Sequence, residues 1–269
     1  MKRETSTSLP VAVTVAGSDS GGGAGIQADL LTFAAHGVYG TTVITSLTAQ
    51  NPREVRAVEA PTAGFVRQQL EAVHAYFPLA ALKTGMLYSR EIIEEVAAFL
   101  ERNPGIPSVV DPVMVATSGA ALLQDEAMAT LREKLLPRAN LLTPNLDEAT
   151  LLWGNPITNE AEMSTAATAL SEEFQTAVLL KGGHMSGESL LDLLVKPGKE
   201  PIPYPKPRIQ GVNTHGSGCT LASAIAAQLA LGEDLESAVT HGLAYLQRTL
   251  QQPLRLGEER FLGHFPNPA

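Results

Sequence analysis

The sequence predicts an α/β protein built on a mostly parallel sheet, with helices on both faces and a small hairpin at one edge. Short apolar segments rich in β-branched residues alternate with segments of helical period along most of the chain. This alternation is typical of strand–helix–strand units, whose strands run parallel. The chain shows neither a long flexible linker nor an internal repeat, so residues 1–269 are expected to form one domain, with residues 1–9 as a flexible start.

The same patterns place the individual elements. Strands are expected at 11–16, 40–47, 80–83, 108–111, 140–143 and 177–181, and helices at 25–36, 62–76, 89–101, 125–135, 160–173 and 221–231. The segments 190–195 and 201–204 flank a Pro-Gly turn and predict the hairpin, because their prolines suit an edge strand. A further short edge strand is expected at 55–59. Ligands of open parallel sheets bind beyond the carboxyl ends of the strands, so the loops there are the candidate site.

Composition narrows the possible partners. The net charge of −9 disfavours nucleic acid and anionic membranes, which would repel the protein. The first ten residues contain no apolar leader, and no run of about 18 apolar residues could span a membrane. A single cysteine, Cys219, excludes an intramolecular disulfide. We therefore expect a cytoplasmic protein with a small-molecule substrate.

The segment Asn213-Thr214-His215-Gly216-Ser217-Gly218-Cys219-Thr220 precedes and opens an apolar helix. Glycines at a helix start expose backbone N–H groups, and the helix dipole adds positive charge, so this segment predicts an anion hole for a transferred phosphoryl group. Cys219 falls in the first turn, where the dipole is expected to lower the pKa of a thiol and make it a candidate base. The alternatives are an ordinary helix start with a packed thiol, and His215 as the base.

A second glycine-rich segment, residues 17–25, follows the first strand. Its glycines would let the backbone approach a ligand closely. It is neither a Walker A loop, because Ile26 stands where lysine is required, nor a dinucleotide-binding fingerprint, because the glycine spacing is wrong. A simple tight turn remains the alternative.

Polar residues at the ends of three other strands suit a metal-bound triphosphate. Asn145 and Glu148 lie three residues apart at a helix start, where an amide and a carboxylate could hold hydrated Mg²⁺ or could simply form a capping box. Asp111 and Lys181 each end an apolar strand, as a carboxylate and an ammonium suited to the metal and the phosphates. Charges at strand ends are otherwise simply solvated.

Taken together, these residues resemble a known family. The motifs are Ala16-Gly17-Ser18-Asp19 with Gly25-Ile26-Gln27-Ala28-Asp29-Leu30, Ala49-Gln50-Asn51, Lys83-Thr84-Gly85-Met86-Leu87, Asp111-Pro112-Val113-Met114, Thr143-Pro144-Asn145-Leu146-Asp147-Glu148-Ala149, Leu180-Lys181-Gly182-Gly183-His184 and the segment at 213–220. In this order they are similar to the hydroxymethylpyrimidine/phosphomethylpyrimidine kinases of thiamine biosynthesis. Several separate matches are more specific than any one of them.

The resemblance implies a ribokinase-like three-layer sandwich and two successive phosphorylations of a pyrimidine alcohol by ATP with Mg²⁺. It also implies a homodimer, because relatives commonly form one. It implies substrate contacts from Gln50, Asp29, Gly17, Met86 and Val113. It assigns catalysis to Cys219, Gly216, Gly218 and Lys181, phosphate binding to Asn145, Lys181, Thr214, Gly216, Ser217 and Gly218, and Mg²⁺ to Glu148 and Asp111. An amide such as Gln50 both donates and accepts hydrogen bonds, and the Met86 sulfur suits a flat ring.

Two other functions fit the same residues. A vitamin B6 kinase would phosphorylate an alcohol on a ring of similar size. A non-catalytic pyrimidine-binding protein could retain the fold without turnover.

Overall fold

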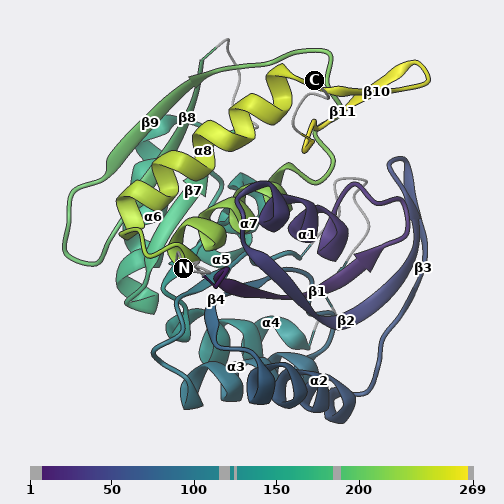
Figure 1. Ribbon diagram of the computed structural model, residues 1–269. Coiled ribbons are helices and arrows are strands. Elements are labelled where there is room, and N and C mark those ends of the chain that lie inside the picture. Colours follow the sequence, from purple (N-terminus) through teal and green to yellow (C-terminus); the bar gives the residue numbers. More distant parts are fainter. Residues whose placement is uncertain (1–7, 115–121, 124–125, 184–188, 266–269) are drawn as a thin grey trace, which may run out of the picture.

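A nine-stranded sheet forms the middle layer of the part of the chain that the structure describes, residues 8–114, 122–123, 126–183 and 189–265 (Figure 1). In this computed structural model the strand order is β3-β2-β1-β4-β5-β6-β7-β8-β9. Strands β2, β1, β4, β5, β6 and β7 run parallel, whereas β3, β8 and β9 are antiparallel to their neighbours. The bounds are β1 Val11–Asp19, β2 Tyr39–Asn51, β3 Glu54–Glu59, β4 Leu79–Thr84, β5 Ser108–Val110, β6 Leu141–Leu142, β7 Ala177–Lys181, β8 Ser189–Val195 and β9 Ile202–Pro207. The prediction of a mostly parallel sheet with an edge hairpin is confirmed.

Helices cover both faces of this sheet and complete three layers (Figure 1). One apolar core joins the sheet to α2 Ala63–Tyr76, α3 Arg90–Arg102, α5 Leu146–Trp153, α6 Glu160–Phe174 and the helical segments between residues 127 and 138. A second core on the opposite face joins it to α1 Gly25–Ala35, α7 Ser217–Ala230 and α8 Leu235–Gln251. The central strands are therefore buried on both sides, which explains their nearly continuous apolar sequences.

The edge strand β9 shows why the hairpin ends the sheet. Its prolines Pro203, Pro205 and Pro207 alternate along the strand, so their missing N–H groups all fall on one side. A strand with that pattern can pair with β8 on one side only, because its other side lacks the N–H donors that pairing with a further strand would need.

Several elements differ from the sequence prediction. The expected helix at 125–135 is α4 Ala127–Thr130 followed by a π-helical turn, Leu131–Leu135, and a 3₁₀ turn, Leu136–Arg138, which contains Pro137. Helix α8 and a small hairpin, β10 Leu254–Leu256 with β11 Glu259–Phe261, were not predicted. Asp125 and most of the expected flexible start lie outside the described residues. Within those residues, we find no helix that is both long and apolar enough to cross a membrane.

Two glycines in helices should respond oppositely to the same substitution. A Cβ at Gly242 in α8 would lie 2.6 Å from Cγ1 of the buried Ile225 in α7, whereas a Cβ at Gly64 in α2 would meet nothing within 4 Å. We expect Gly242→Ala to lower the free energy of unfolding by about 1–3 kcal/mol through overpacking. Gly64→Ala should raise it by about 0.4–1 kcal/mol, because it restricts the unfolded chain without strain. Urea unfolding measures both, and equal signs would contradict the packing of α7 on α8.

Candidate active site

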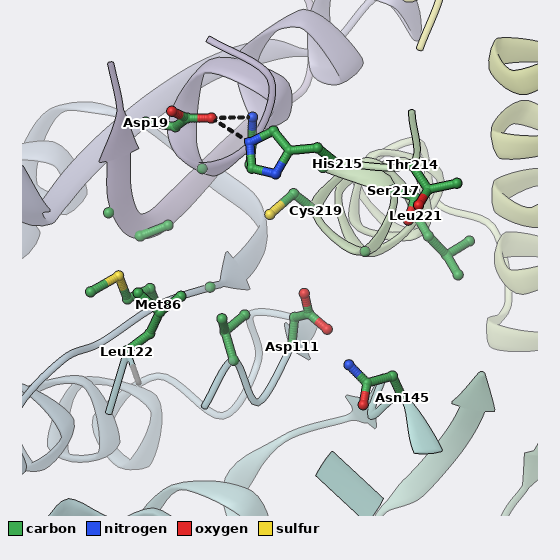
Figure 2. A pocket seen from close by; sticks show the side chains of 18 of the residues that line it. Asp19, Met86, Asp111, Leu122, Asn145, Thr214, His215, Ser217, Cys219 and Leu221 are labelled. Atoms are coloured by element: carbon green, nitrogen blue, oxygen red, sulfur yellow. Dashed lines mark hydrogen bonds and ion pairs between the residues drawn. The ribbon is translucent and has the colours of Figure 1, made fainter. Parts of the chain in front are cut away.

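One cavity of about 520 Å³ opens at the carboxyl ends of the parallel strands. Residues from the loops after β1, β2, β4, β5, β6 and β7 line it, together with the start of α7. Met86 and Leu122 lie at one end and Asn145 at the other, with Cys219 and Asp111 between them (Figure 2). The cavity thus has two ends joined at the start of α7. Among the predicted site residues, the following line it: Gly17, Gln50, Met86, Asp111, Val113, Asn145, Glu148, Lys181, Thr214, Gly216, Ser217, Gly218 and Cys219.

Asp19, the last residue of β1, organises the glycine-rich loop. Its carboxylate accepts hydrogen bonds from the backbone N–H groups of Gly21 (2.8 Å), Gly23 (3.2 Å) and Ala24 (2.9 Å). It also lies 2.8 Å from Nε2 of His215, the residue before the α7 cap (Figure 2). Burial raises the pKa of the Asp19 carboxyl, but these hydrogen bonds outweigh burial and hold its pKa below the ordinary value. Asp19 therefore joins two loops that are far apart in sequence.

The same two loops touch through their backbones. Gly216, the N-cap of α7, has a φ of +84°, and a Cβ there would lie 1.8 Å from the carbonyl oxygen of Gly23. No side chain caps the first turn of α7, and the Ser217 N–H donates to the Thr214 carbonyl at 3.0 Å. The Gly218 and Cys219 N–H groups are the ones left for another acceptor. A glycine cap and the positive end of a 14-residue helix thus lie at the cavity, as expected for an anion hole.

Gly218 brings two charged groups close to this helix start. A Cβ at Gly218 would lie 3.3 Å from Nζ of Lys181 and 3.4 Å from Oδ2 of Asp111. Lys181 in turn lies 3.0 Å from Oδ1 of Asp111, which also accepts a hydrogen bond from Thr143 at 2.9 Å. The glycine therefore lets an ammonium and a carboxylate approach the backbone where a phosphoryl group would sit.

Cys219 is partly exposed and lines the cavity beside these charges. Burial raises the pKa of its thiol to about 11, with the carboxylates of Asp29 and Asp111 acting in the same direction and the Lys83 ammonium opposing them. The prediction that the helix start lowers this pKa is therefore wrong. Loss of hydration outweighs the dipole, so the thiol is protonated at neutral pH.

Asp29 was predicted to contact the substrate, and here the structure differs. Its carboxylate is fully buried and lies 2.8 Å and 2.9 Å, through its two oxygens, from Nζ of Lys83. Thr14 and Ser223 also donate hydrogen bonds to it, at 2.6 Å and 2.7 Å. All of its partners are protein groups, and it does not form part of the cavity wall. Asp29 instead anchors α1 to β1, β4 and α7. Its ion pair with Lys83 is buried, so removing either partner would leave the other as an uncompensated buried charge.

The Lys83 ammonium lies just behind the cavity floor. A Cβ at Gly85, a cavity residue, would lie 3.1 Å from its Nζ. Burial lowers the pKa of Lys83, but Asp29, Cys219 and Asp111 together raise it above its ordinary value. A permanent positive charge therefore lies beneath the part of the site that holds Cys219.

At the other end of the cavity, Asn145 and Glu148 form the capping box that was the alternative to a metal site. The Asn145 side chain accepts from the Glu148 N–H at 2.9 Å, and a Glu148 oxygen accepts from the Asn145 N–H at 2.8 Å. Burial raises the pKa of Glu148 to about 7, with Lys181 opposing and Asp111 reinforcing the effect. A carboxyl so placed, facing a second carboxylate, is one that a divalent cation would stabilise in its charged form. The capping role and a metal role are thus compatible.

The lining of the cavity also includes Gln50, Met86 and Gly17. Gln50 places Nε2 at 3.4 Å from His215 Nε2, and Met86 places its sulfur 3.6 Å from the hydroxyl oxygen of Ser46. A Cβ at Gly17 would lie 2.5 Å from that same hydroxyl oxygen, so a glycine is required there. Sequence reasoning missed Asp19 and ranked His215 low, although Asp19 lies at the carboxyl end of β1 and that position could have identified it.

A cavity at the carboxyl ends of parallel strands, with an ammonium, carboxyl groups and a glycine-capped helix start in its wall, is typical of a small-molecule kinase. Residues 19–264 match the family model described as phosphomethylpyrimidine kinase. The hydroxymethylpyrimidine/phosphomethylpyrimidine kinase of Rhizobium meliloti (strain 1021) is 50% identical over 247 residues, covering 91% of this chain and 92% of that protein.

Solved structures agree with this assignment. A phosphomethylpyrimidine kinase from Clostridium difficile 630 is 41% identical with a TM-score of 0.78, covering 90% of this chain and 99% of that one. An ADP complex of Bacillus subtilis pyridoxal kinase is 33% identical with a TM-score of 0.87, covering 96% and 98%. The chain belongs to the phosphomethylpyrimidine kinase family and has the ribokinase-like fold, as the sequence motifs indicated.

The raised pKa of Glu148 predicts a specific pH dependence of stability. An unfolded glutamate has a pKa of about 4.3, so between that pH and about 7 the folded protein holds a proton that the unfolded chain has lost. This contribution to stability is complete at low pH and is lost as pH rises toward 7. In metal-free buffer, Glu148→Gln should therefore gain stability relative to the wild type on going from pH 5 to pH 8.

Urea unfolding at the two pH values measures this difference. Glu162→Gln is the matched control, since Glu162 is an exposed capping acid whose pKa is lowered by hydrogen bonds from Thr158. Its effect should be the same at both pH values. A Glu148→Gln effect that also stays constant would contradict the buried, raised-pKa carboxyl.

Proposed function

We propose that this protein transfers the γ-phosphoryl group of ATP to 4-amino-5-hydroxymethyl-2-methylpyrimidine and then to the resulting monophosphate, in thiamine biosynthesis. The observation that carries the proposal is the two-ended cavity, with Met86 at one end, Asn145 at the other and the start of α7 between them (Figure 2). Gln50 and Lys181 also line this cavity. The names of the relatives, which cover most of this chain, support the same substrates.

The pyrimidine alcohol would occupy the end formed by Gln50, Met86, Val113 and Gly17. Gln50 can donate to one ring nitrogen or accept from the amino group, and Met86 offers a polarisable sulfur to the ring face. The open glycine-rich loop leaves room for the added phosphate of the second step. Asp29 has no direct part in this recognition, since its carboxylate is already satisfied within the protein.

The donor phosphates would lie between Lys181, Asn145 and the segment from Thr214 to Gly218. In-line attack of the alcohol on the γ-phosphorus places negative charge on the phosphoryl oxygens. The backbone N–H groups at the start of α7 and the Lys181 ammonium would stabilise that charge, and a Cβ at Gly218 would lie 3.3 Å from Nζ of Lys181.

Mg²⁺ is expected at Glu148 and Asp111. Both carboxyl groups line the cavity, and burial, reinforced by the Asp111 carboxylate, raises the pKa of Glu148 in a way that a bound cation would oppose. Within the described residues no cluster of three or more metal-ligating side chains occurs. That fits Mg²⁺ bound mainly by phosphates and water with one or two carboxylates. When bound, the ion would neutralise charge on the transferring phosphates.

A single domain, a homodimer and a cytoplasmic location complete the proposal. The one cysteine is consistent with a reducing compartment. Size-exclusion chromatography with light scattering measures the assembly directly.

Cys219 is the proposed base for the substrate hydroxyl. Because its thiol has a pKa of about 11, only a small fraction is thiolate at neutral pH, and activity should rise as pH increases above 7. We expect Cys219→Ala to lower kcat by about 10²–10⁴ with little change in the KM of the alcohol or of ATP. The activity of this variant should no longer rise with pH. Steady-state rates from pH 6 to 10 measure both effects. An alanine variant with the wild-type kcat would mean that the thiol only packs.

The substrate itself is tested by the products. Mass spectrometry after incubation with hydroxymethylpyrimidine and MgATP should show the monophosphate and then the diphosphate. The similarity to a pyridoxal kinase makes pyridoxal the second candidate substrate, so kcat/KM for the two alcohols should be compared. A strong preference for pyridoxal would overturn the pyrimidine assignment. Ligand binding without ADP release above background would instead indicate a non-catalytic binding protein.

A further inference from the structure

A fully buried carboxylate, Asp192 on β8, holds a lysine at the cavity wall. One Asp192 oxygen accepts the backbone N–H of Gly182 at 2.9 Å, and the other is ion-paired with Nζ of Lys206 on β9. The Asp192 side chain has no exposed surface, whereas 20% of the Lys206 side chain is exposed. The carboxylate therefore lies in the protein interior, whereas the ammonium forms part of the cavity wall.

Strand register explains why this lysine faces the site. Lys181 pairs with Asp192 across β7 and β8, and Asp192 pairs with Tyr204 across β8 and β9. Directly opposed residues share a face of the sheet, and so do residues two apart, which places Lys206 on the same face as Lys181. Tyr204 packs with the α7 and α8 core, so this is the face on which α7 begins.

Lys206 lies at the donor end of the cavity. Met86, which follows β4, marks one end of the cavity, and Asn145, which follows β6, marks the other, donor end (Figure 2). Strand β9 lies beyond β7 and β8 in the sheet, on the donor side of the α7 cap. Gly183, which follows Lys181 at the end of β7, lines the cavity together with Lys206.

Nucleotide phosphates need positive charge at this end of the cavity. Four carboxyl groups line it, those of Asp19, Asp111, Asp147 and Glu148. Lys181 is already paired with Asp111 at 3.0 Å, so a nucleoside triphosphate would meet a wall with little unpaired positive charge. The Lys206 ammonium carries three N–H groups, and Asp192 accepts a hydrogen bond from one of them.

We propose that Lys206 is a second phosphate-binding lysine, which contacts the phosphates of the donor nucleotide, and that Asp192 is the residue that positions it. This inference rests on the proposed kinase function and adds a residue to its donor site. Asp192 limits the freedom of a long flexible side chain, so less entropy is lost when the ammonium engages a phosphate. The opposing reading is that Lys206 only neutralises the buried Asp192.

A pair of variants separates the two readings. Lys206→Met removes the ammonium and keeps the apolar stem, but leaves the Asp192 carboxylate without its cation. Lys206→Met with Asp192→Asn removes both charges and retains an oxygen to accept the Gly182 N–H. The double variant thus avoids an uncompensated buried charge and keeps the test valid if the single variant is unstable. Lys199→Met is the matched control, since Lys199 is exposed in the turn between β8 and β9.

Calorimetry of MgADP binding gives a readout that does not depend on turnover. We expect the Kd of ADP to rise about tenfold in both the single and the double variant, as for loss of one charge-assisted hydrogen bond. The Kd of the pyrimidine alcohol should stay unchanged, and Lys199→Met should match the wild type in both.

Recovery of wild-type ADP affinity in the double variant would overturn the inference, because it would show that Lys206 serves only Asp192. An unchanged Kd in the single variant would overturn it as well. In either case a wild-type protein that phosphorylates the alcohol leaves the proposed function standing. A wild type that binds neither ADP nor ATP would overturn both.

Discussion

The site depends on the contact between two backbone segments, the glycine-rich loop before α1 and the cap of α7. Gly216 approaches the Gly23 carbonyl so closely that a Cβ would overlap it, and Gly25 approaches the Gly17 carbonyl in the same way. Asp19 then secures the contact by bonding loop N–H groups and His215 together. Because glycines form the contact itself, the backbones of the two loops can approach each other this closely at the start of α7.

A buried ion pair behind the cavity floor stabilises this contact. Asp29 on α1 joins Lys83 on β4 and Ser223 on α7, one turn after Cys219. Removing one partner of such a pair typically costs about 3–5 kcal/mol, since the other charge stays buried. The pair therefore fixes α7 relative to the sheet, and it also places a positive charge behind the cavity floor at Gly85. Both the geometry and the electrostatics of the site follow from this arrangement.

Much of the fold was predictable because its signals are local. Strand β7 was predicted at its observed bounds, and the helices α1, α2, α3 and α6 within a residue or two, since apolar periodicity and capping residues mark them. The interrupted helix after residue 126 and the hairpin β10–β11 were not, because tertiary contacts rather than propensity shape them. The cavity residues Asn145 and Lys181 were found because one begins a helix and the other ends a strand, whereas Gln50 was found only through the family resemblance.

By itself, the sequence determined the order of elements as far as α7, the glycine-rich start of that helix and the motifs that mark the family. Only the tertiary structure decided the state of its charged groups. In the folded protein Asp29 is a buried ion-pair partner, and burial raises the pKa of the Cys219 thiol. Lys206, on an edge strand, lines the cavity. The physical reason is that hydration and neighbouring charges set these properties, and the neighbours come from elements far apart in the chain.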